Sequence, residues 1–261
     1  MNHPQSPWVI AHRGGAGGHA NLENRLAAYE ASLNIGVHAV ECDVHLSADN
    51  EVVVIHDETL DRTTAGHGHV NACTAAELAC LGVPTLQQLC QFVRGRARLL
   101  IEIKGASPYR VLDVIQSEKM EREVIVISFH AEYLRPIARL RPDIELGFLL
   151  YQFNNDVPDL ARYIEAGRAL NATMLAPHLR LCTRKLVAAA HAAGLRVFAW
   201  TANSPRQQRR LIRAGVDGIV SDFPEQLIRM LHAVRSRRRE EADVAGLKTD
   251  PPPHVSYNAS P

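Results

Sequence analysis

The chain has 261 residues, of which 46% are hydrophobic and 22% charged, and its 29 basic and 28 acidic residues leave a formal net charge of +1. This balance excludes a strongly basic nucleic-acid-binding chain, and chains of about 250 residues commonly form one α/β barrel. The chain has no apolar run of about 18 residues, no signal-peptide pattern, and five cysteines without a C-x-x-C pair. We therefore expect a soluble, cytoplasmic protein with no nucleic-acid partner and no stable membrane insertion.

Short runs rich in β-branched residues alternate with helical segments along the chain. Strands are predicted at residues 8–12, 39–44, 99–104, 124–129, 145–150, 173–177, 196–201 and 218–222. Helices are predicted at residues 24–36, 85–95, 109–118, 131–140, 159–167, 184–194, 205–215 and 225–235. Strands that alternate with helices pair in parallel, and eight such units can close. The predicted fold is therefore α/β, a single (β/α)8 TIM barrel. An open doubly wound sheet is the alternative, although no G-x-G-x-x-G fingerprint follows the first strand.

Two segments fall outside this alternation. Residues 52–56, VVVIH, are predicted to form an extra strand, which the turn-rich link SADNE joins to the second strand. From residue 235 the sequence is charged and then Pro-rich, without a periodic apolar face. We expect residues 1–234 to form the barrel and residues 235–261 to form a disordered tail.

Polar side chains stand where the apolar strands end, and active sites of such barrels lie at the carboxyl ends of the strands. Glu41 and Asp43 share one face of the second strand because side chains alternate along a strand, whereas Cys42 faces the other way. Glu102 and Lys104 share a face of the third strand in the same way. Either pair alone is typical of surface acids or a salt bridge. Their convergence on one barrel mouth favours a functional site.

Three carboxylates at one barrel mouth repel one another in a low-dielectric pocket. A divalent cation bound by Glu41, Asp43 and Glu102 would relieve this repulsion. Oxygen ligands favour Mg²⁺ or Ca²⁺, and two nearby histidines also admit Mn²⁺. The sequence therefore predicts one divalent cation as cofactor.

Two histidines complete this constellation, His12 at the end of the first strand and His56 at the end of the extra strand. Imidazole has an ordinary pKa near neutrality, so one histidine can act as a base and the other as an acid. Arg13 offers a planar fork of donors suited to a phosphate, and Lys104 adds a second positive charge. Alone, each histidine would be interpreted as a hydrogen-bonded rim residue. Together these residues favour phosphodiester hydrolysis without a covalent serine or cysteine.

A series of motifs in fixed order covers roughly residues 8–230. The motifs are AHRGG, ENRLAAYEAS, ECDVHLSADNEVVVIHDETLDRTT, PTLQQL, IEIK, ISF, AWTAN and GVDGIVSDFP. In these motifs the chain resembles the glycerophosphodiester phosphodiesterases of the bacterial, cytoplasmic type. The resemblance implies a TIM barrel of the phospholipase C-like phosphodiesterase type. Leu22 and Arg25 replace the Pro and Thr of the family's P-E-N-T pattern, while Glu23 and Asn24 are retained; Glu23 either orients site groups or caps the first helix.

The resemblance also implies roles for single residues. His12 and His56 match the catalytic histidines. The family's metal ligands match Glu41, Asp43 and Glu102. Its phosphate-contacting residues match Arg13 and Lys104. The aromatic residues that line its glycerol pocket match Trp200 and Phe129.

The leading hypothesis is metal-dependent hydrolysis of a small-molecule glycerophosphodiester to sn-glycerol 3-phosphate and an alcohol. The attacking group is either water or the substrate's own 2-hydroxyl. One alternative keeps the site and changes the substrate to a lysophospholipid, as in a lysophospholipase D. The other alternative is a non-catalytic barrel that binds phosphodiesters, and it is disfavoured because every catalytic and ligand position is filled.

Overall fold

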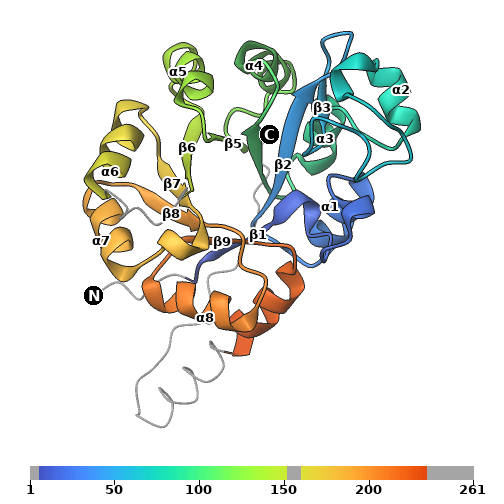
Figure 1. The fold of residues 1–261 in the computed structure, drawn as a ribbon. Coiled ribbons are helices and arrows are strands. Elements are labelled where there is room, and N and C mark those ends of the chain that lie inside the picture. The colour runs from blue at the N-terminus through green and yellow to red at the C-terminus, as the bar shows by residue number, and fades with distance from the viewer. Residues whose placement is uncertain (1–5, 152–159, 234–261) are drawn as a thin grey trace.

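The computed structural model describes residues 6–151 and 160–233, and within them eight parallel strands close into a barrel surrounded by helices (Figure 1). The barrel strands are β1 (Trp8–Ala11), β2 (Ala39–Leu46), β4 (Arg98–Ile103), β5 (Val124–Ser128), β6 (Glu145–Leu150), β7 (Met174–Pro177), β8 (Arg196–Ala199) and β9 (Gly218–Ser221). The ring closes because β1 pairs in parallel with both β9 and β2. This closure confirms the predicted (β/α)8 barrel and excludes the open sheet.

The predicted extra strand is present as β3 (Val52–Val54), which pairs antiparallel with β2 outside the ring. It is shorter than predicted, because regular pairing ends at Val54. The Ile55 N–H still donates to the Asp43 carbonyl at 3.0 Å. His56 therefore stands in a loop that β2 and β3 hold against the barrel mouth.

The helices are α1 (Leu26–Asn34), α2 (Ala75–Cys80), α3 (Leu86–Val93), α4 (Pro108–Ser117), α5 (Ala131–Leu140), α6 (Leu160–Ala169), α7 (Arg184–Ala192) and α8 (Pro205–Ala214), and residues 224–233 are also helical. The described residues do not include residue 159 of the predicted helix 159–167 or residues 234 and 235 of the predicted helix 225–235. The predicted tail at 235–261 also lies outside them. Among the described residues, no helix combines the length and the apolar composition that crossing a membrane requires.

Helix α2 was not predicted, although the sequence carries a signal for it. Thr74 accepts from the N–H of Glu77 at 3.3 Å, and the Glu77 carboxylate accepts from the N–H of Thr74 at 2.7 Å. This reciprocal pair is a capping box, whose sequence pattern is Ser or Thr followed three residues later by Glu or Gln. The helix is only 6 residues long, too short to give a clear apolar period.

The side chains of β2 alternate between two apolar layers. Cys42 lies in the cluster packed between the strands and the helices, whereas Ala39 lies in the cluster inside the barrel. Glu41 and Asp43 are on the same face as Ala39 and so point into the barrel. Each apolar side chain fully buried in either layer contributes about 1.5–3 kcal/mol. This burial fixes the register that holds two acids inside the barrel.

An ionic and aromatic cluster closes the amino end of the barrel. Glu145 accepts from Arg98 Nη2 at 2.8 Å through Oε1 and from Arg196 Nη2 through Oε2. The guanidinium carbons of Arg98 and Arg196 lie over the Trp8 ring, 6.0 and 5.7 Å from its centroid. The polar residues singled out in the sequence lie at the opposite, carboxyl end.

Candidate active site

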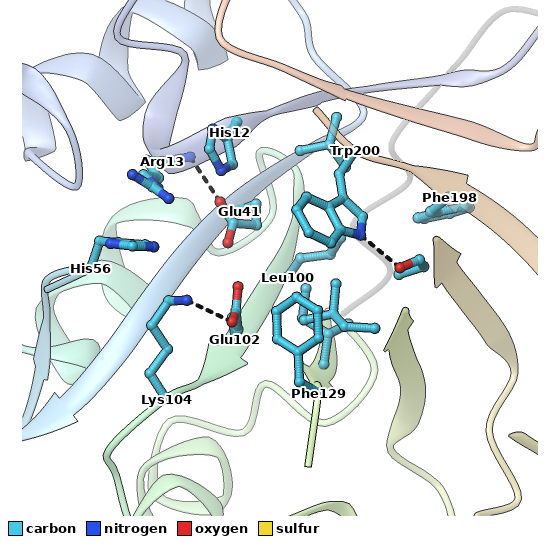
Figure 2. A pocket seen from close by; sticks show the side chains of 14 residues that line it. His12, Arg13, Glu41, His56, Leu100, Glu102, Lys104, Phe129, Phe198 and Trp200 are labelled. Carbon is cyan, nitrogen blue, oxygen red and sulfur yellow. Dashed lines mark hydrogen bonds and ion pairs between the residues drawn. The ribbon is translucent and has the colours of Figure 1, made fainter. Parts of the chain in front are cut away.

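The predicted site residues gather around one cavity of about 170 Å³ at the carboxyl ends of the strands. Figure 2 shows its charged residues on one side and its aromatic side chains on the other. The predicted residues that line it are His12, Arg13, Glu41, His56, Glu102, Lys104, Phe129 and Trp200. Asp43, the remaining predicted residue, is fully buried beside Glu41 and Glu102. The structure therefore brings every predicted site residue into one place.

A tight turn after β1 presents His12 and Arg13 to this cavity. Within the turn, Arg13 has a φ of 50°, a left-handed conformation that costs free energy in a residue other than glycine. The Arg13 N–H donates to Glu41 Oε2 at 2.9 Å, and the Arg13 carbonyl accepts from the Asn24 N–H at 3.0 Å. These bonds hold the strained turn and place an imidazole and a guanidinium beside β2.

The three predicted metal ligands form a compact group. Glu41, Asp43 and Glu102 offer oxygen atoms that lie within 4.8 Å of one another. The three residues are 3%, 0% and 9% exposed. Asp43 stands directly opposite Glu102 in the ladder between β2 and β4. Glu41 and Asp43 already share one face of β2. The pairing of β2 with β4 then brings Glu102, 59 residues beyond Asp43 in the sequence, beside them.

Burial and mutual repulsion oppose full ionisation of this group. Burial, followed by the charge of Asp43, raises the pKa of Glu41 to about 7 and the pKa of Glu102 to about 8. Burial acts on Asp43 as well, but the charge of Arg13 and of other nearby cationic groups lowers the pKa of Asp43. At neutral pH the protein alone therefore holds Asp43 as a carboxylate, keeps Glu102 mostly protonated and leaves Glu41 only partly ionised.

The donor set fits a divalent cation. Asp43 Oδ1 is buried without a hydrogen-bond partner, and Lys104 Nζ lies 3.6 Å from it, too far for a good hydrogen bond. A buried carboxylate oxygen without a partner is unfavourable, and a metal ion between the three acids would satisfy it. Ligands that are all oxygen favour Mg²⁺ or Ca²⁺.

Two cationic side chains flank the carboxylates. Arg13 Nη1 donates to Glu23 Oε2 at 2.8 Å, and Arg13 Nε lies 3.3 Å from Asp43 Oδ2. Lys104 Nζ donates to Glu102 Oε1 at 2.8 Å. Burial opposes the charge of Lys104, but Asp43 and Glu102 raise the pKa of Lys104, so it stays protonated. Both side chains can therefore donate to an anionic ligand in the cavity.

His12 is oriented by a carboxylate from the far end of the chain. Its Nδ1 lies 2.6 Å from Asp222 Oδ1, and the Asp222 N–H in turn donates to Asn203 Oδ1 at 2.9 Å. Burial lowers the pKa of His12, but the hydrogen bond to Asp222 and the charge of Glu41 outweigh it and raise the pKa overall. With Nδ1 engaged, Nε2 is the ring nitrogen left to face the cavity.

His56 is oriented in the same way by the next residue. Its Nδ1 lies 2.5 Å from Asp57 Oδ1, and the His56 carbonyl accepts from His45 Nε2 at 3.0 Å. Burial is the main influence on this imidazole and lowers the pKa of His56. The pKa values of His12 and His56 are therefore displaced in opposite directions.

Aromatic rings form the wall opposite the charged residues (Figure 2). Trp200 Nε1 donates to the Ala176 carbonyl at 2.6 Å, which fixes the indole. The Phe129 ring meets the indole edge-on with centroids 5.5 Å apart, and Tyr151 stacks on it at 6.0 Å. Phe198 adds to the apolar floor below. The cavity therefore joins a charged half to an apolar half.

Asp222 and Arg62 shape the site but were not predicted from the sequence. Asp222 holds His12, and Arg62 binds Asp57, the strand-end acid that holds His56. Asp222 follows the last strand directly, so the strand-end rule that identified His12 could also have identified it. Glu23 was predicted either to orient site groups or to cap a helix, and its carboxylate contacts Arg13.

The comparisons with known proteins agree with this geometry. A model of the family described as "Glycerophosphoryl diester phosphodiesterase family" matches residues 12–226. The chain is 33% identical over 244 residues to "Glycerophosphodiester phosphodiesterase" of Caldanaerobacter subterraneus subsp. tengcongensis, a match that covers 85% of this chain and 97% of the relative.

Solved structures show the same likeness. A crystal structure of a putative glycerophosphoryl diester phosphodiesterase from Silicibacter pomeroyi is 27% identical, with a TM-score of 0.79, and the match covers 89% of this chain and 95% of that one. A phosphodiesterase from Oleispira antarctica, solved in complex with the product sn-glycerol-3-phosphate, is 26% identical with a TM-score of 0.77. That match covers 87% of this chain and 97% of the Oleispira chain.

Proposed function

The chain belongs to the glycerophosphoryl diester phosphodiesterase family and is a hydrolase of that type, and we propose that it releases sn-glycerol 3-phosphate and an alcohol by acid–base catalysis between His12 and His56. The observation that carries the proposal is the arrangement of these histidines around a buried group of three carboxylates, of which Figure 2 shows Glu41 and Glu102. The product named with the Oleispira structure supports the choice of substrate class.

Glu41, Asp43 and Glu102 would hold one divalent cation, and the unpartnered Asp43 oxygen supports this assignment. When bound, the cation supplies positive charge that stabilises the phosphoryl oxygens in the transition state. Its presence also lets all three acids ionise, because it offsets their mutual repulsion.

Arg13 and Lys104 would bind the non-bridging oxygens of the phosphodiester. Their charged donors flank the carboxylate group, and a phosphate accepts strong hydrogen bonds from both guanidinium and ammonium. As negative charge builds on the phosphoryl oxygens in the transition state, these contacts strengthen.

We assign the proton transfers from the opposite pKa displacements. His56, with its pKa lowered, is neutral and takes the proton of the attacking oxygen at Nε2. His12, with its pKa raised, is the ring that holds a proton at Nε2 more readily, and it gives this proton to the leaving alkoxide. Because each Nδ1 is bound to an aspartate, each ring has one nitrogen available for this work. The pair thus begins in the two protonation states that the reaction consumes.

The apolar half of the cavity would receive the carbon chain of the substrate. Trp200 and Phe129 form a rigid wall against which the glycerol carbons can pack, while its hydroxyls stay at the polar half. The aliphatic floor of Leu100, Ile127 and Leu149 continues this surface inward. A lysophospholipid is the second candidate substrate, favoured by this apolar floor, which would accept part of an acyl chain.

The testing experiment is a substrate panel assayed with Mg²⁺, Ca²⁺, Mn²⁺ or EDTA. Glycerophosphodiesters with different alcohols should release sn-glycerol 3-phosphate with metal and lose activity in EDTA. Full activity in EDTA would remove the cation from the proposal. A higher kcat/KM for lysophosphatidylcholine than for glycerophosphocholine would instead favour the second candidate.

A substrate without the 2-hydroxyl separates the two attacking groups. If water attacks the phosphorus directly, the 2-deoxy glycerophosphodiester is still hydrolysed. If the 2-hydroxyl attacks first through a cyclic phosphate, the 2-deoxy compound binds and inhibits but is not turned over.

A further inference from the structure

Arg62 stands outside the cavity and joins two carboxylates of the site. It lies in the loop that follows β3, is 40% exposed, and is not among the residues that line the cavity. Its Nη1 and Nη2 donate to Glu23 Oε1 and Oε2 at 3.1 and 3.0 Å. Its Nε and Nη2 also donate to the two oxygens of Asp57 at 2.6 and 3.1 Å. One planar guanidinium thus makes four bonds to two acids.

The chain of contacts continues to a proposed catalytic group. Asp57 Oδ1, which accepts from Arg62, is also the oxygen 2.5 Å from His56 Nδ1. The hydrogen bond from Arg62 is the main influence that lowers the pKa of Asp57, so the carboxylate is ionised whenever His56 is titrating. Arg62 therefore fixes both the direction and the charge of the group that orients His56.

The position of Arg62 is itself fixed by a buried part of its loop. Thr63, the next residue, is 4% exposed. The Thr63 carbonyl accepts from Arg25 Nη2 at 2.7 Å, and the Leu81 carbonyl accepts from Arg25 Nη1 at 2.8 Å. Arg25, which replaces the Thr of the sequence pattern, thereby ties the start of α1 to the loop that carries Arg62.

The simpler explanation is that Arg62 only stabilises the fold. The small stability that an exposed ion pair contributes argues against this explanation. Exposed ion pairs contribute little stability. Arg62, however, makes four hydrogen bonds to two acids that contact proposed catalytic or phosphate-binding residues, since Asp57 binds His56 and Glu23 binds Arg13. A fork of this geometry restricts rotation of Asp57 in a way that a single ammonium does not.

We propose that Arg62, held by Glu23, is a positioning residue that fixes Asp57 and through it the imidazole of His56. The proposal rests on the proposed role of His56 in the reaction. It assigns to Arg62 no contact with the substrate. Loss of Arg62 should therefore slow turnover without weakening substrate binding.

The first experiment compares R62M with R96M, a matched control. Arg96 is 36% exposed and makes the same kind of two-bond contact, to Glu30 on the outer surface, at 2.8 and 3.1 Å. R62M should lower kcat by about 10–100-fold, with little change in KM. This is the range for residues that orient a functional side chain without touching the substrate. R96M should keep both kcat and KM. An R62M enzyme with the kcat of R96M overturns the proposal.

Two further measurements separate positioning from simple damage to the fold. Because Arg62 acts through Asp57, the double variant R62M/D57N should be no slower than D57N alone; independent, multiplying losses overturn the proposal. Methylguanidinium added to R62A should restore part of kcat, and it should restore nothing in H56A. The absence of any recovery in R62A, with its melting temperature unchanged, also counts against the proposal.

The H56A variant tests the proposed function separately from the role of Arg62. Near-normal turnover in H56A would contradict the proposed reaction and with it this proposal. Loss of turnover in H56A together with an unaffected R62M would contradict the positioning role alone.

Discussion

At the scale of single residues, two histidines are held alike by aspartates, one distant in the chain and one adjacent. Asp222 follows β9 and Asp57 follows β3, yet each accepts from the Nδ1 of its histidine, at 2.6 and 2.5 Å. Such a bond selects one tautomer and one ring orientation. Burial lowers the pKa of both rings, but Asp222 and Glu41 together outweigh it at His12, whereas burial prevails at His56.

Removing either imidazole should slow the reaction strongly. H12A and H56A should each lower kcat on a glycerophosphodiester by a factor on the order of 10²–10⁴, the contribution of general acid–base catalysis. A substrate whose leaving alcohol is a nitrophenol distinguishes the two, because a good leaving group needs no proton. On that substrate H12A should recover much of its activity and H56A should not. Recovery in H56A instead would reverse the assigned roles.

Replacing the carboxylate behind His12 should have a smaller effect. D222N keeps the shape but removes the charge, and kcat should fall by about 10–100-fold. The control is D217N, because Asp217 makes a similar contact to His191 Nε2, at 2.7 Å, at the amino end of β9. Steady-state kinetics on both variants provides the comparison. Equal activity in D222N and D217N would contradict the orienting role of Asp222.

What the sequence could predict at this scale depended on strand position. The alternation in β2 placed Glu41 and Asp43 on one face and Cys42 on the other, as the structure has them. The partner of His12 was not predicted, because its contact with Asp222 spans 210 residues. It exists only once the barrel closes.

At the scale of elements, β2 and β4 form a ladder that carries an excess of buried acid. Asp43 and Glu102 are register partners in it, and Glu41 lies on the same inner face. The strands tolerate this arrangement because Arg13 and Lys104 supply two positive charges at one end. A cation would complete the balance.

Cation affinity should therefore depend on pH. Burial and the charge of Asp43 raise the pKa of Glu41 to about 7 and that of Glu102 to about 8, so at neutral pH a metal ion must displace protons from them. Affinity should rise as the pH rises through these two values. Isothermal titration calorimetry in buffers of different ionisation enthalpy measures both the affinity and the protons released. A flat profile would contradict ligation by these acids.

The same ladder should gain stability from the metal. A ligand at 100 times its dissociation constant stabilises the native state by about 2.7 kcal/mol. Thermal unfolding followed with and without Mg²⁺ or Ca²⁺ should show a higher melting temperature with metal. D43N should abolish that increase, because it removes the central carboxylate. An undiminished metal effect in D43N would place the cation elsewhere.

Elements were predictable where they were regular. The eight barrel strands have runs of β-branched and aliphatic residues, and their predicted positions agree with the structure to within two residues at each end. Helix α2 was missed because its 6 residues carry no clear period. His56 was predicted to end a strand, but β3 stops at Val54 since the loop beyond it bends toward the barrel mouth.

At the scale of the whole molecule, stability and chemistry lie at opposite ends of the barrel. The carboxyl end holds the strained turn, the crowded acids and the cavity. The amino end holds Trp8, Arg98, Glu145 and Arg196 in a satisfied cluster. A change at the amino end should therefore alter unfolding without altering turnover.

The substitution E145Q tests this separation. It leaves Arg98 and Arg196 facing each other without a counter-charge, and the free energy of unfolding at neutral pH should fall by about 1–2 kcal/mol, since the group is partly exposed. Urea unfolding measures the loss, and kcat should stay at the wild-type value. A loss of kcat in a folded E145Q protein would show that the two ends are coupled.

The effect of E145Q should also depend on pH in a defined direction. Burial raises the pKa of Glu145, but the hydrogen bond from Arg98 and the charge of Arg196 outweigh it and lower the pKa below its usual value of 4.5. A carboxyl group with a lowered folded-state pKa stabilises the protein at pH above its unfolded-state pKa, and this contribution is lost as the pH falls through the folded-state value. The stability difference between wild type and E145Q should thus be full at neutral pH and shrink in acid. A difference that grows in acid would mean that Glu145 is protonated more readily in the folded protein than in the unfolded chain.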